Sequence, residues 1–324
     1  MTTNLERQIR SQPDELSRLL NAHETQAQVR EAAEGLHRAH RIWIVGTGSS
    51  LHAAEIGAAL FAEAGRAATV VSAMRFVTTA PVMGAQDSVV VISHTGETAY
   101  ALAARAVAFE HRLDTVTITR RGAGSAHTIE TVEKESSETY TVSYTASLLV
   151  LAMLAKELGA DSIEDEHLAS VPAAVSAAIE DPGIEGISAP ERLLVFTASG
   201  ITATTASESA LKSREAARVA AEGFDVEYLL HGQAVPLDSR DRLVVLDPPE
   251  EPLLDAVAAA ASSAGVAVSR LHEPSGLTPL LAQIPLSVRG QMLALRNAQA
   301  AKTDPDIVMV GPWADPAIWS VGAP

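Results

Sequence analysis

The feature that most constrains the fold is a repeated unit, in which a short apolar strand is followed by a turn of small residues and then by a helix. The unit occurs at residues 41–63 and 87–109, and it begins again at residue 192. Continuous apolar strands that alternate with helices are typical of a parallel sheet covered by helices on both faces. The sequence therefore predicts an α/β fold.

The repeat of this unit after a stretch rich in proline and acidic residues predicts a domain boundary. A chain of 324 residues is long enough for two domains of ordinary size. The predicted organisation is a helical segment at 1–35, a first domain at 36–160, a linker with a short helix at 161–190, a second domain at 191–302 and a C-terminal tail at 303–324.

Three expected elements decide the topology of the second domain. The pattern predicts a long helix from residue 206 to about residue 221, a last strand at 285–288 and a final helix at 291–301. The order of elements resembles that of the first domain, which indicates an internal duplication.

Composition excludes several classes of function. The formal charge is −16, which argues against binding to nucleic acid or to an anionic membrane surface, because both depend on clusters of Lys and Arg. The chain has no cysteine, so disulfides, thiolate nucleophiles and zinc–thiolate sites are excluded. No apolar run reaches the roughly 18 residues of a membrane span, and the first residues lack a signal pattern. We expect a cytoplasmic protein.

Two turns carry the residues that could bind a ligand, and the first is Gly46-Thr47-Gly48-Ser49-Ser50. A dinucleotide fingerprint requires Gly or Ala at position 51, where Leu51 stands, and no Gly-Lys-Ser/Thr of a nucleotide-binding P-loop follows. What remains is a glycine turn with hydroxyl groups at the start of a helix.

The second turn is Ser93-His94-Thr95-Gly96-Glu97-Thr98, and it follows the next strand in the same way. A helix N-terminus carries roughly half a positive charge and free backbone N–H groups, which suit a phosphate monoester without any Lys or Arg. The carboxyl ends of parallel strands are also where open α/β sheets bind ligands. The alternative is that these Ser and Thr residues only cap the helices.

At these two turns the sequence resembles the sugar isomerase (SIS) domain family. Residues 36–305 most resemble its double-SIS members, the isomerase halves of glutamine–fructose-6-phosphate aminotransferases and the fructosamine-6-phosphate deglycases. The resemblance implies two tandem SIS domains, each with a parallel, flavodoxin-like sheet of five strands. It also implies that the phosphate site is formed by Gly48, Ser49, Ser50, Ser93, Thr95 and Thr98, with His94 lining the pocket.

Two segments of the second half strengthen this resemblance. Residues 208–215, Glu-Ser-Ala-Leu-Lys-Ser-Arg-Glu, resemble the family's Glu-Gly-Ala-Leu-Lys-x-Lys-Glu helix, and residues 230–234 resemble its Lys-His-Gly-Pro segment. The resemblance implies that Glu215 moves a proton between C1 and C2 of the sugar and that Lys212 lies near the sugar. It further implies that His231 assists ring opening and is supplied by the other subunit of a homodimer.

The side chains named for catalysis are chemically suitable, because a carboxylate and a histidine both transfer protons. Each also has a simpler interpretation. The simpler interpretation of Glu215 is a solvated helix residue that is paired with Lys212. The simpler interpretation of His231 is a capping or core histidine.

The sequence departs from the double-SIS pattern at four points. First, we expect this chain to lack the glutaminase domain of the aminotransferases. Second, the family has a catalytic lysine in the tail after its last helix, whereas residues 303–324 contain no lysine. The family's Val-Ala-Ser-Thr-Lys loop is replaced by residues 138–142, which puts Glu138 at the sugar site and predicts a changed sugar preference. Gln233 stands where the family has proline.

The sequence as a whole favours an enzyme that acts on an amino-sugar or ketosamine 6-phosphate as a deglycase, a deaminase or an aldose–ketose isomerase. The expected step is proton transfer between C1 and C2 by Glu215, which requires neither a metal ion nor an organic cofactor. A second hypothesis is a non-catalytic sugar-phosphate sensor. A purified-protein assay for turnover distinguishes the two.

Overall fold

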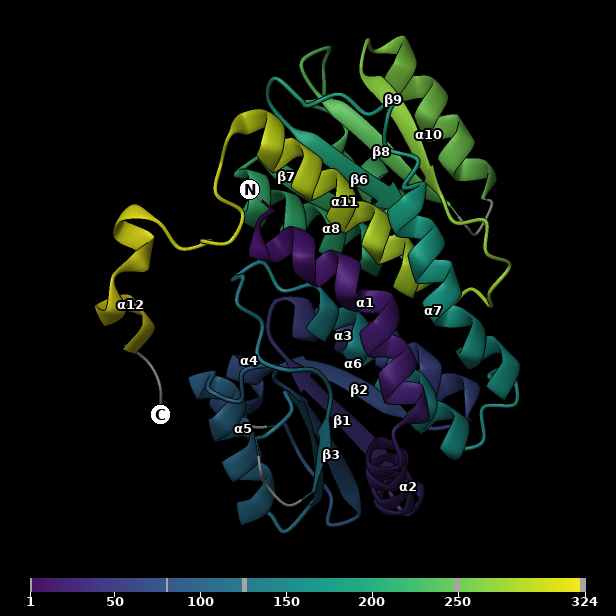
Figure 1. Cartoon of the computed structure of the whole chain (residues 1–324), viewed down its shortest axis with the longest axis vertical. Coiled ribbons are helices and arrows are strands. Elements are labelled where there is room, and N and C mark those ends of the chain that lie inside the picture. The colour runs from purple at the N-terminus through teal and green to yellow at the C-terminus, as the bar shows by residue number, and fades with distance from the viewer. Residues whose placement is uncertain (1, 80, 124–126, 248–250, 321–324) are drawn as a thin grey trace. The chain divides into compact units, whose positions relative to one another are not determined.

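The computed structural model describes residues 2–79, 81–123, 127–247 and 251–320 (Figure 1). The chain divides into two compact units, each built around one sheet. The first-sheet unit contains residues 14–135, 142–170 and 309–324, and the second-sheet unit contains residues 1–13, 136–141 and 171–308. Residues 321–324 of the expected tail lie outside the described residues.

The first sheet has five parallel strands in the order β2-β1-β3-β4-β5, which is the flavodoxin-like order. In register, Val45 of β1 lies opposite Val71 of β2 and Val91 of β3. The strands are β1 (Arg41–Gly46), β2 (Ala68–Ser72), β3 (Asp87–Ile92), β4 (Asp114–Thr119) and β5 (Thr128–Glu130).

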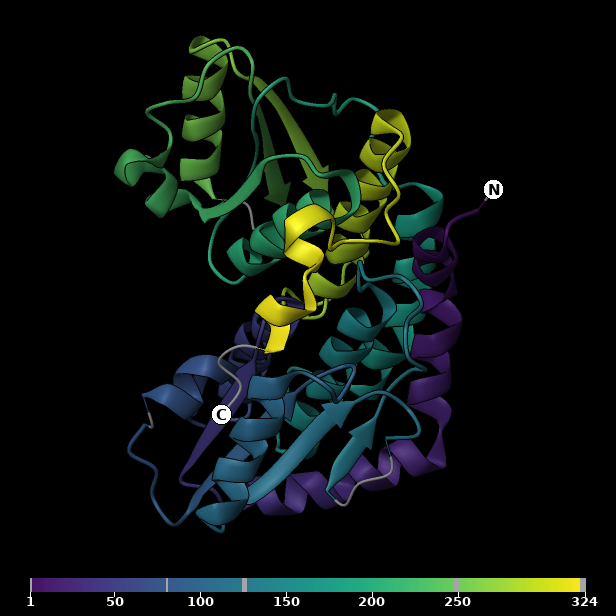
Figure 2. The same ribbon diagram turned by 90° about the vertical axis from the view of Figure 1, so that its left-hand side faces the viewer.

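Helices cover both faces of the first sheet (Figure 2). On one face, α4 (Ala73–Thr78) and α5 (Ala99–Glu110) pack in an apolar cluster with Trp43, Val45, Val89 and Val91. A further group of helices in this unit packs around α6 (Val142–Glu157), which contacts both α2 (His23–His37) and α3 (Ser49–Glu63). Since side chains alternate along a strand, a strand buried on both faces is apolar on both, as residues 42–45 of β1 and 89–92 of β3 are.

The second sheet has four parallel strands among the described residues, in the order β7-β6-β8-β9. The prediction of five strands in each sheet is therefore wrong for this unit. The order repeats that of the first four strands of the first sheet. The strands are β6 (Leu194–Ala198), β7 (Ala221–Asp225), β8 (Arg242–Asp247) and β9 (Ala267–His272).

The strand expected at 285–288 is wrong, because these residues belong to α11 (Gln283–Ala301). Pro285 is compatible with the first turn of a helix, where the missing N–H has no intrahelical partner. Residues 283–291 are all buried, so this part of the helix lacks the exposed polar face of an amphipathic helix, and its polar residues Gln283, Ser287 and Gln291 are buried with the rest.

The helix expected at 206–221 is also displaced, because α8 spans Thr202–Ala217 and β7 begins at Ala221. Gly223 lies in the middle of β7, and a Cβ atom there would lie 2.4 Å from the Cα of Ser207 in α8. The strand therefore needs a glycine, a residue that weakens the strand pattern in a sequence.

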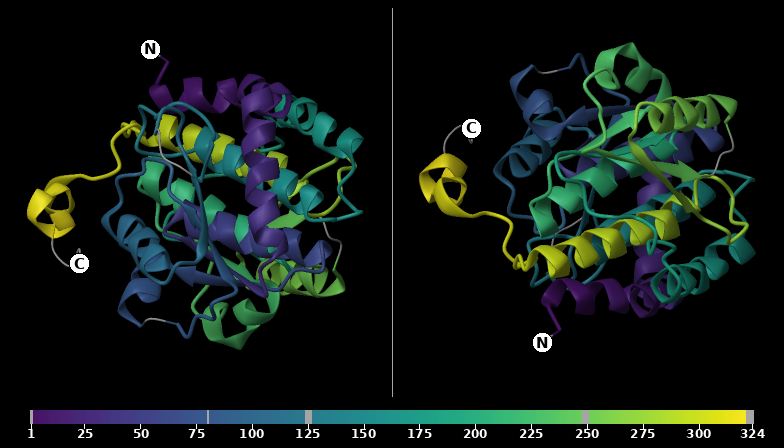
Figure 3. Two further views of the ribbon diagram at one scale, coloured as in Figure 1. Left: turned by 90° about the horizontal axis from the view of Figure 1, so that it is seen from below. Right: turned by 90° about the horizontal axis from the view of Figure 1, so that it is seen from above.

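Helices lie on the two faces of the second sheet (Figure 3). Each face is covered by an apolar cluster. One contains side chains of α8 and α11, and the other contains side chains of α10 (Pro252–Ser263) and of the segment formed by α9 (Val226–Tyr228) and η1 (Leu229–Gln233). Each unit thus has its own buried core.

The remaining elements are α1 (Asn4–Asn21), α7 (Asp165–Glu180), η2 (Gly311–Ala314) and α12 (Pro316–Ser320). Asp306 caps the start of α1, since its carboxylate accepts hydrogen bonds from the backbone N–H groups of Asn4 (2.8 Å) and Leu5 (2.7 Å). Among the described helices, none combines the length and the apolar character that a membrane span requires.

Candidate functional site

The first turn connects β1 directly to α3. Position 46 must be glycine because the backbone of α3 approaches it closely: a Cβ atom here would lie 2.3 Å from the backbone oxygen of Ser50. Gly48 is the N-cap residue of α3 with φ +58°, and Ser49 and Ser50 are the first two residues of that helix. The turn therefore brings small residues and hydroxyl side chains to a helix start, where the helix dipole favours an anion.

The second turn connects β3 to α5 and lies at the same edge of the sheet, because β3 and β1 are neighbouring parallel strands. Ser93 follows β3 directly and is only 7% exposed. Its hydroxyl group is buried and makes no hydrogen bond with any described residue. Buried polar groups usually have partners, so an unpartnered hydroxyl at this position indicates a site for a ligand.

The imidazole of His94 holds the turn in place. Its Nε2 atom accepts a hydrogen bond from the backbone N–H of Glu135 at 3.1 Å. Burial, together with the positive charges of Arg120 and Lys134, lowers the pKa of His94 to about 4. His94 is therefore neutral at physiological pH, as its role as a hydrogen-bond acceptor requires.

The other residues of the turn have different surroundings. The hydroxyl of Thr95 accepts a hydrogen bond from the backbone N–H of Glu97 at 3.1 Å, so it stabilises the turn itself. Thr98 is the N-cap residue of α5, and its side chain makes no capping hydrogen bond. Glu97 is exposed and forms an ion pair with Lys134 at 2.8 Å; the hydrogen bond from Lys134 lowers the pKa of Glu97.

Glu138 belongs to the second-sheet unit, whereas the two turns that carry the other expected phosphate ligands belong to the first-sheet unit. Its carboxylate accepts a hydrogen bond from the backbone N–H of Val308 at 2.7 Å, and its own N–H donates to the carbonyl of Asp306 at 2.9 Å. Within this unit the residue therefore ties its loop to the segment that follows α11.

The residues expected to be catalytic include a buried charged group on α8. The Nζ atom of Lys212 forms an ion pair with the carboxylate of Glu215 and lies 3.5 Å from Glu208. The side chains of Lys212 and Glu208 are each 1% exposed, whereas that of Glu215 is 18% exposed. The Lys212–Glu215 pair thus exists, but it is only partly solvated, because its lysine is buried.

Charges buried in this way are costly unless they are paired. Lys212 stands between the carboxylates of Glu208 and Glu215, and Glu215 is the member of this group that solvent can reach. A carboxylate that is held by a buried lysine and remains accessible is suited to accept and return a proton.

His231 lies in the same unit as this group but in a different environment. It belongs to η1, where its backbone (φ −83°, ψ 45°) and that of Gly232 (φ 108°) leave the helical region. Its side chain is exposed and makes no hydrogen bond or ion pair with any residue that the structure describes. The interpretation of His231 as a core histidine therefore does not fit.

Three residues at these sites were not among the expected site residues. Glu208 is the third member of the charged group, and its spacing of four residues from Lys212 is the signal that identifies it. The other two residues contact the second turn. Glu135 donates its N–H to His94, and its carboxylate accepts a hydrogen bond from the N–H of Ser143 at the start of α6. Arg120 donates to the carbonyl of Thr95. No local sequence pattern identifies Glu135, whereas Arg120 opens a basic turn, Arg-Arg-Gly, directly after a strand.

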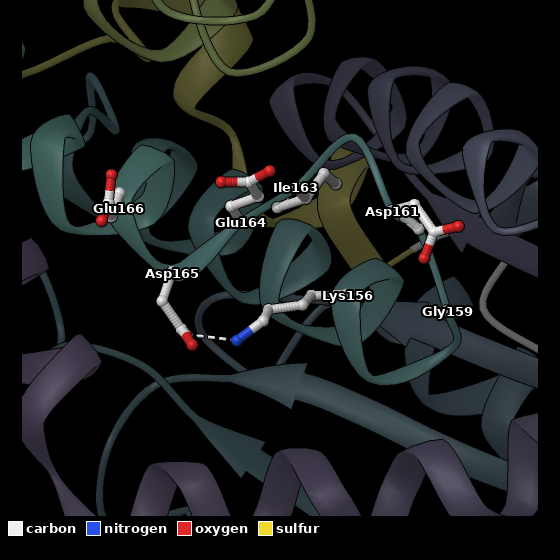
Figure 4. Close-up of a pocket in the computed structure, with 8 residues that line it drawn as sticks. Lys156, Gly159, Asp161, Ile163, Glu164, Asp165 and Glu166 are labelled. Carbon is white, nitrogen blue, oxygen red and sulfur yellow. Dashed lines mark hydrogen bonds and ion pairs between the residues drawn. The ribbon is translucent and has the colours of Figure 1, made fainter.

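A separate pocket lies between the end of α6 and the start of α7 (Figure 4). It contains none of the expected site residues. Four carboxylates and one ammonium group line it, and Lys156 forms an ion pair with Asp165. This excess of negative charge opposes a phosphate, so the pocket does not compete with the turns as an anion site. Its lining residues are Lys156, Gly159, Ala160, Asp161, Ile163, Glu164, Asp165 and Glu166.

Comparison with known proteins identifies a family for part of the chain. Residues 35–157 match the family described as the SIS domain. The glutamine–fructose-6-phosphate aminotransferase of Methanothermobacter thermautotrophicus is 30% identical over 227 residues, which cover 67% of this chain and 38% of that protein. That of Pyrococcus horikoshii is 29% identical over 282 residues, which cover 79% of this chain and 47% of that protein. The chain thus spans less than half the length of these relatives.

Solved structures share the fold. A tagatose-6-phosphate ketose/aldose isomerase from Escherichia coli superimposes with a TM-score of 0.79 at 21% identity, covering 96% of this chain and 97% of that chain. A glucosamine-6-phosphate deaminase from Thermotoga maritima gives 0.78 at 20% identity, covering 94% and 97%. The expectation of an α/β fold with parallel sheets flanked by helices is confirmed.

Proposed function

We propose, from the premise that residues 35–157 form a SIS domain, that this protein is an enzyme acting on an amino-sugar or ketosamine 6-phosphate. The turns at 46–50 and 93–98 bind the phosphate, and Glu215 transfers a proton between C1 and C2. The reaction is of the isomerase, deaminase or deglycase type. We also propose that the second sheet belongs to a second SIS domain.

The observation that carries the catalytic part is the charged group on α8. Proton transfer between adjacent carbons needs one base that removes the proton and returns it to the neighbouring carbon. Glu215 is accessible and is paired with Lys212, which is 1% exposed. The reaction type is supported by the proteins of similar structure, which include a ketose/aldose isomerase and a glucosamine-6-phosphate deaminase.

The phosphate part is supported by the chemistry of the turns. Ser93 has a buried hydroxyl without a described partner, and α3 and α5 begin at the two turns on neighbouring strands. Phosphate is held at such positions by N–H and O–H donors and by the helix dipole. The phosphate then serves as the group by which the sugar is recognised.

The proposal includes a homodimer in which His231 acts on the sugar bound by the partner subunit. His231 is exposed in a loop that also exposes apolar side chains, namely Tyr228 (56%), Leu230 (50%) and Val235 (84%). Apolar side chains that gather on a surface are typical of an interface. A second copy of the chain is the partner that this proposal requires.

The test is proton exchange in D₂O, because it detects the shared step whatever the final product. The wild-type protein should incorporate deuterium at C1 or C2 of fructose 6-phosphate, glucosamine 6-phosphate or fructosamine 6-phosphate, as followed by NMR. Glu215→Gln should lower this rate by at least about a hundredfold, the contribution typical of general base catalysis. Binding of the sugar phosphate should persist in this variant.

Glu222→Gln is the matched control, because Glu222 lies in the same unit but is 44% exposed and pairs with Arg214. It should exchange like the wild type. Full activity of Glu215→Gln would remove the catalytic assignment. Binding of sugar phosphates by the wild type without exchange or amine release would instead indicate a sugar-phosphate sensor.

A further inference from the structure

Arg120 lies against the turn at 93–98, although it comes from a different strand. It directly follows β4, the neighbour of β3 in the sheet. Its backbone N–H donates to the carbonyl of His94 at 3.0 Å, and its Nε donates to the carbonyl of Thr95 at 3.3 Å. The guanidinium group is therefore held beside the turn that contains the buried hydroxyl of Ser93.

The charges around this turn are already matched, with one exception. Lys134 is paired with Glu97, and Arg121 is paired with Glu133. His94 is neutral, because its Nε2 accepts a hydrogen bond. Arg120 donates only to two carbonyl groups, those of Thr95 and Arg121, and forms no ion pair with a described carboxylate.

The guanidinium group of Arg120 thus has donors left over. Of its nitrogen atoms, Nη2 donates to no residue that the structure describes. The side chain is partly buried, so its charge is only partly screened by solvent. A partly buried cation that forms no ion pair with a described carboxylate, and that lies against a turn with a buried, unpartnered hydroxyl group and a helix start, is suited to bind an anion.

We propose that Arg120 is a further phosphate-binding residue of this site, which adds a full positive charge to the hydroxyl groups and N–H groups of the two turns. The inference rests on the proposed function and deepens it, because the turns alone suit a phosphate without any Lys or Arg. An arginine fork matches two oxygens of a phosphate monoester. Binding should therefore favour the dianionic phosphate and weaken as salt concentration rises.

The test compares Arg120→Gln and Arg120→Lys with Arg121→Gln. Arg121 is the matched control, because it is the adjacent residue and carries the same charge, but its guanidinium is paired with exposed Glu133. Calorimetric titration with fructose 6-phosphate measures the Kd. Loss of a charge-assisted hydrogen bond should raise it by roughly ten- to a hundredfold in Arg120→Gln. Arg121→Gln should stay within about twofold of the wild type.

Arg120→Lys keeps the charge but loses the fork, so its Kd should rise by at least about threefold. This conservative variant decides the question if Arg120→Gln does not fold. The affinity of the wild type and of Arg121→Gln should also fall more steeply with rising salt concentration than the affinity of Arg120→Gln does. Equal affinity of the wild type and the Arg120 variants would overturn the role of Arg120 and leave the proposed function standing. Failure of the wild type to bind any of the three sugar phosphates would overturn both.

Discussion

Ser93 illustrates how a single residue can be placed for function at a cost to stability. Its hydroxyl group is buried at the end of β3 without a described hydrogen-bond partner. An unsatisfied buried polar group costs about 1–3 kcal/mol of folding free energy. A bound phosphate would supply the missing partner, so the cost is recovered when the ligand is present.

Replacing Ser93 by Ala should therefore separate binding from stability. We expect the variant to bind fructose 6-phosphate about five- to tenfold more weakly, since it loses one hydrogen bond worth about 1 kcal/mol. Its free energy of unfolding without ligand should be equal to or higher than that of the wild type. Calorimetric titration and chemical denaturation measure the two quantities.

Thr131→Val is the matched control for Ser93→Ala. Thr131 is also buried in the first-sheet unit, but its hydroxyl donates to the carbonyl of Thr119 at 2.8 Å. This variant should lose about 1 kcal/mol of stability and keep its affinity. A marked loss of stability in Ser93→Ala would show that the hydroxyl has a structural partner.

At the scale of elements, the two sheets use the same device to join their central strands. Asp87 at the start of β3 accepts hydrogen bonds from Arg41 at the start of β1, from Trp43 Nε1 (2.9 Å) and from the N–H of Gly84 (3.0 Å). In the second-sheet unit, Asp241 before β8 accepts hydrogen bonds from Arg192 before β6. Each carboxylate fixes the amino ends of two neighbouring strands.

Burial by itself would raise the pKa of Asp87, but hydrogen bonds from Arg41, the Gly84 N–H and Trp43 outweigh it and lower the pKa below 3.8. A carboxyl group with a lowered pKa in the folded state stabilises the fold fully above its unfolded pKa. This stabilisation is lost as pH falls through the folded pKa. Its contribution should therefore be constant near neutral pH and should shrink below about pH 4.

Asp87→Asn should lower the free energy of unfolding by about 2 kcal/mol or more at pH 7. The difference from the wild type should decrease as the pH is lowered below about 4. Asp114→Asn is the control, since Asp114 begins β4 but pairs with Arg38 on the surface, 59% exposed. It should cost less than about 1 kcal/mol. Denaturation curves at several pH values measure both, and a pH-independent difference would contradict the role of the Asp87 charge.

At the scale of the molecule, net charge and local charge have different consequences. The formal charge of −16 disfavours polyanionic partners. The turns of the first-sheet unit nevertheless combine helix N-termini with the cation Arg120, which forms no ion pair with a described carboxylate. A small anion responds to the potential within a few ångströms, because charges beyond about 8–10 Å are screened by salt.

The proposed dimer predicts complementation between two inactive variants. Glu215→Gln and His231→Ala should each lack turnover alone. If His231 serves the partner's sugar, then a mixed dimer contains one intact site, and random mixing in equal amounts should restore about one quarter of the wild-type activity. Mixing after mild dissociation, followed by the deuterium-exchange assay, measures this. No recovery, although sedimentation shows mixed dimers, would place His231 in its own subunit's site.

Much of the fold was predictable from local sequence. The apolar strands at 41–46 and 87–92 are each followed by a glycine- or hydroxyl-bearing turn and a helix, and this order indicates a parallel sheet. The two wrong predictions, a strand at 285–288 and a helix that continues to residue 221, have the same cause. The segment at 285–288 lies in a helix buried on all sides, and β7 contains Gly223 because α8 approaches it. In both, tertiary packing overrides the local pattern.

The sequence by itself determined the two turns, the spacing of Glu208, Lys212 and Glu215 on one helix, and the absence of cysteine chemistry, because these depend only on neighbours along the chain. The tertiary structure alone decided that Lys212 is buried between two carboxylates, that Ser93 lacks a described partner and that Arg120 lies beside the turn at 93–98. Burial and hydrogen bonding between strands arise only when distant segments pack. The charge that a ligand encounters is therefore a property of the fold and not of a motif.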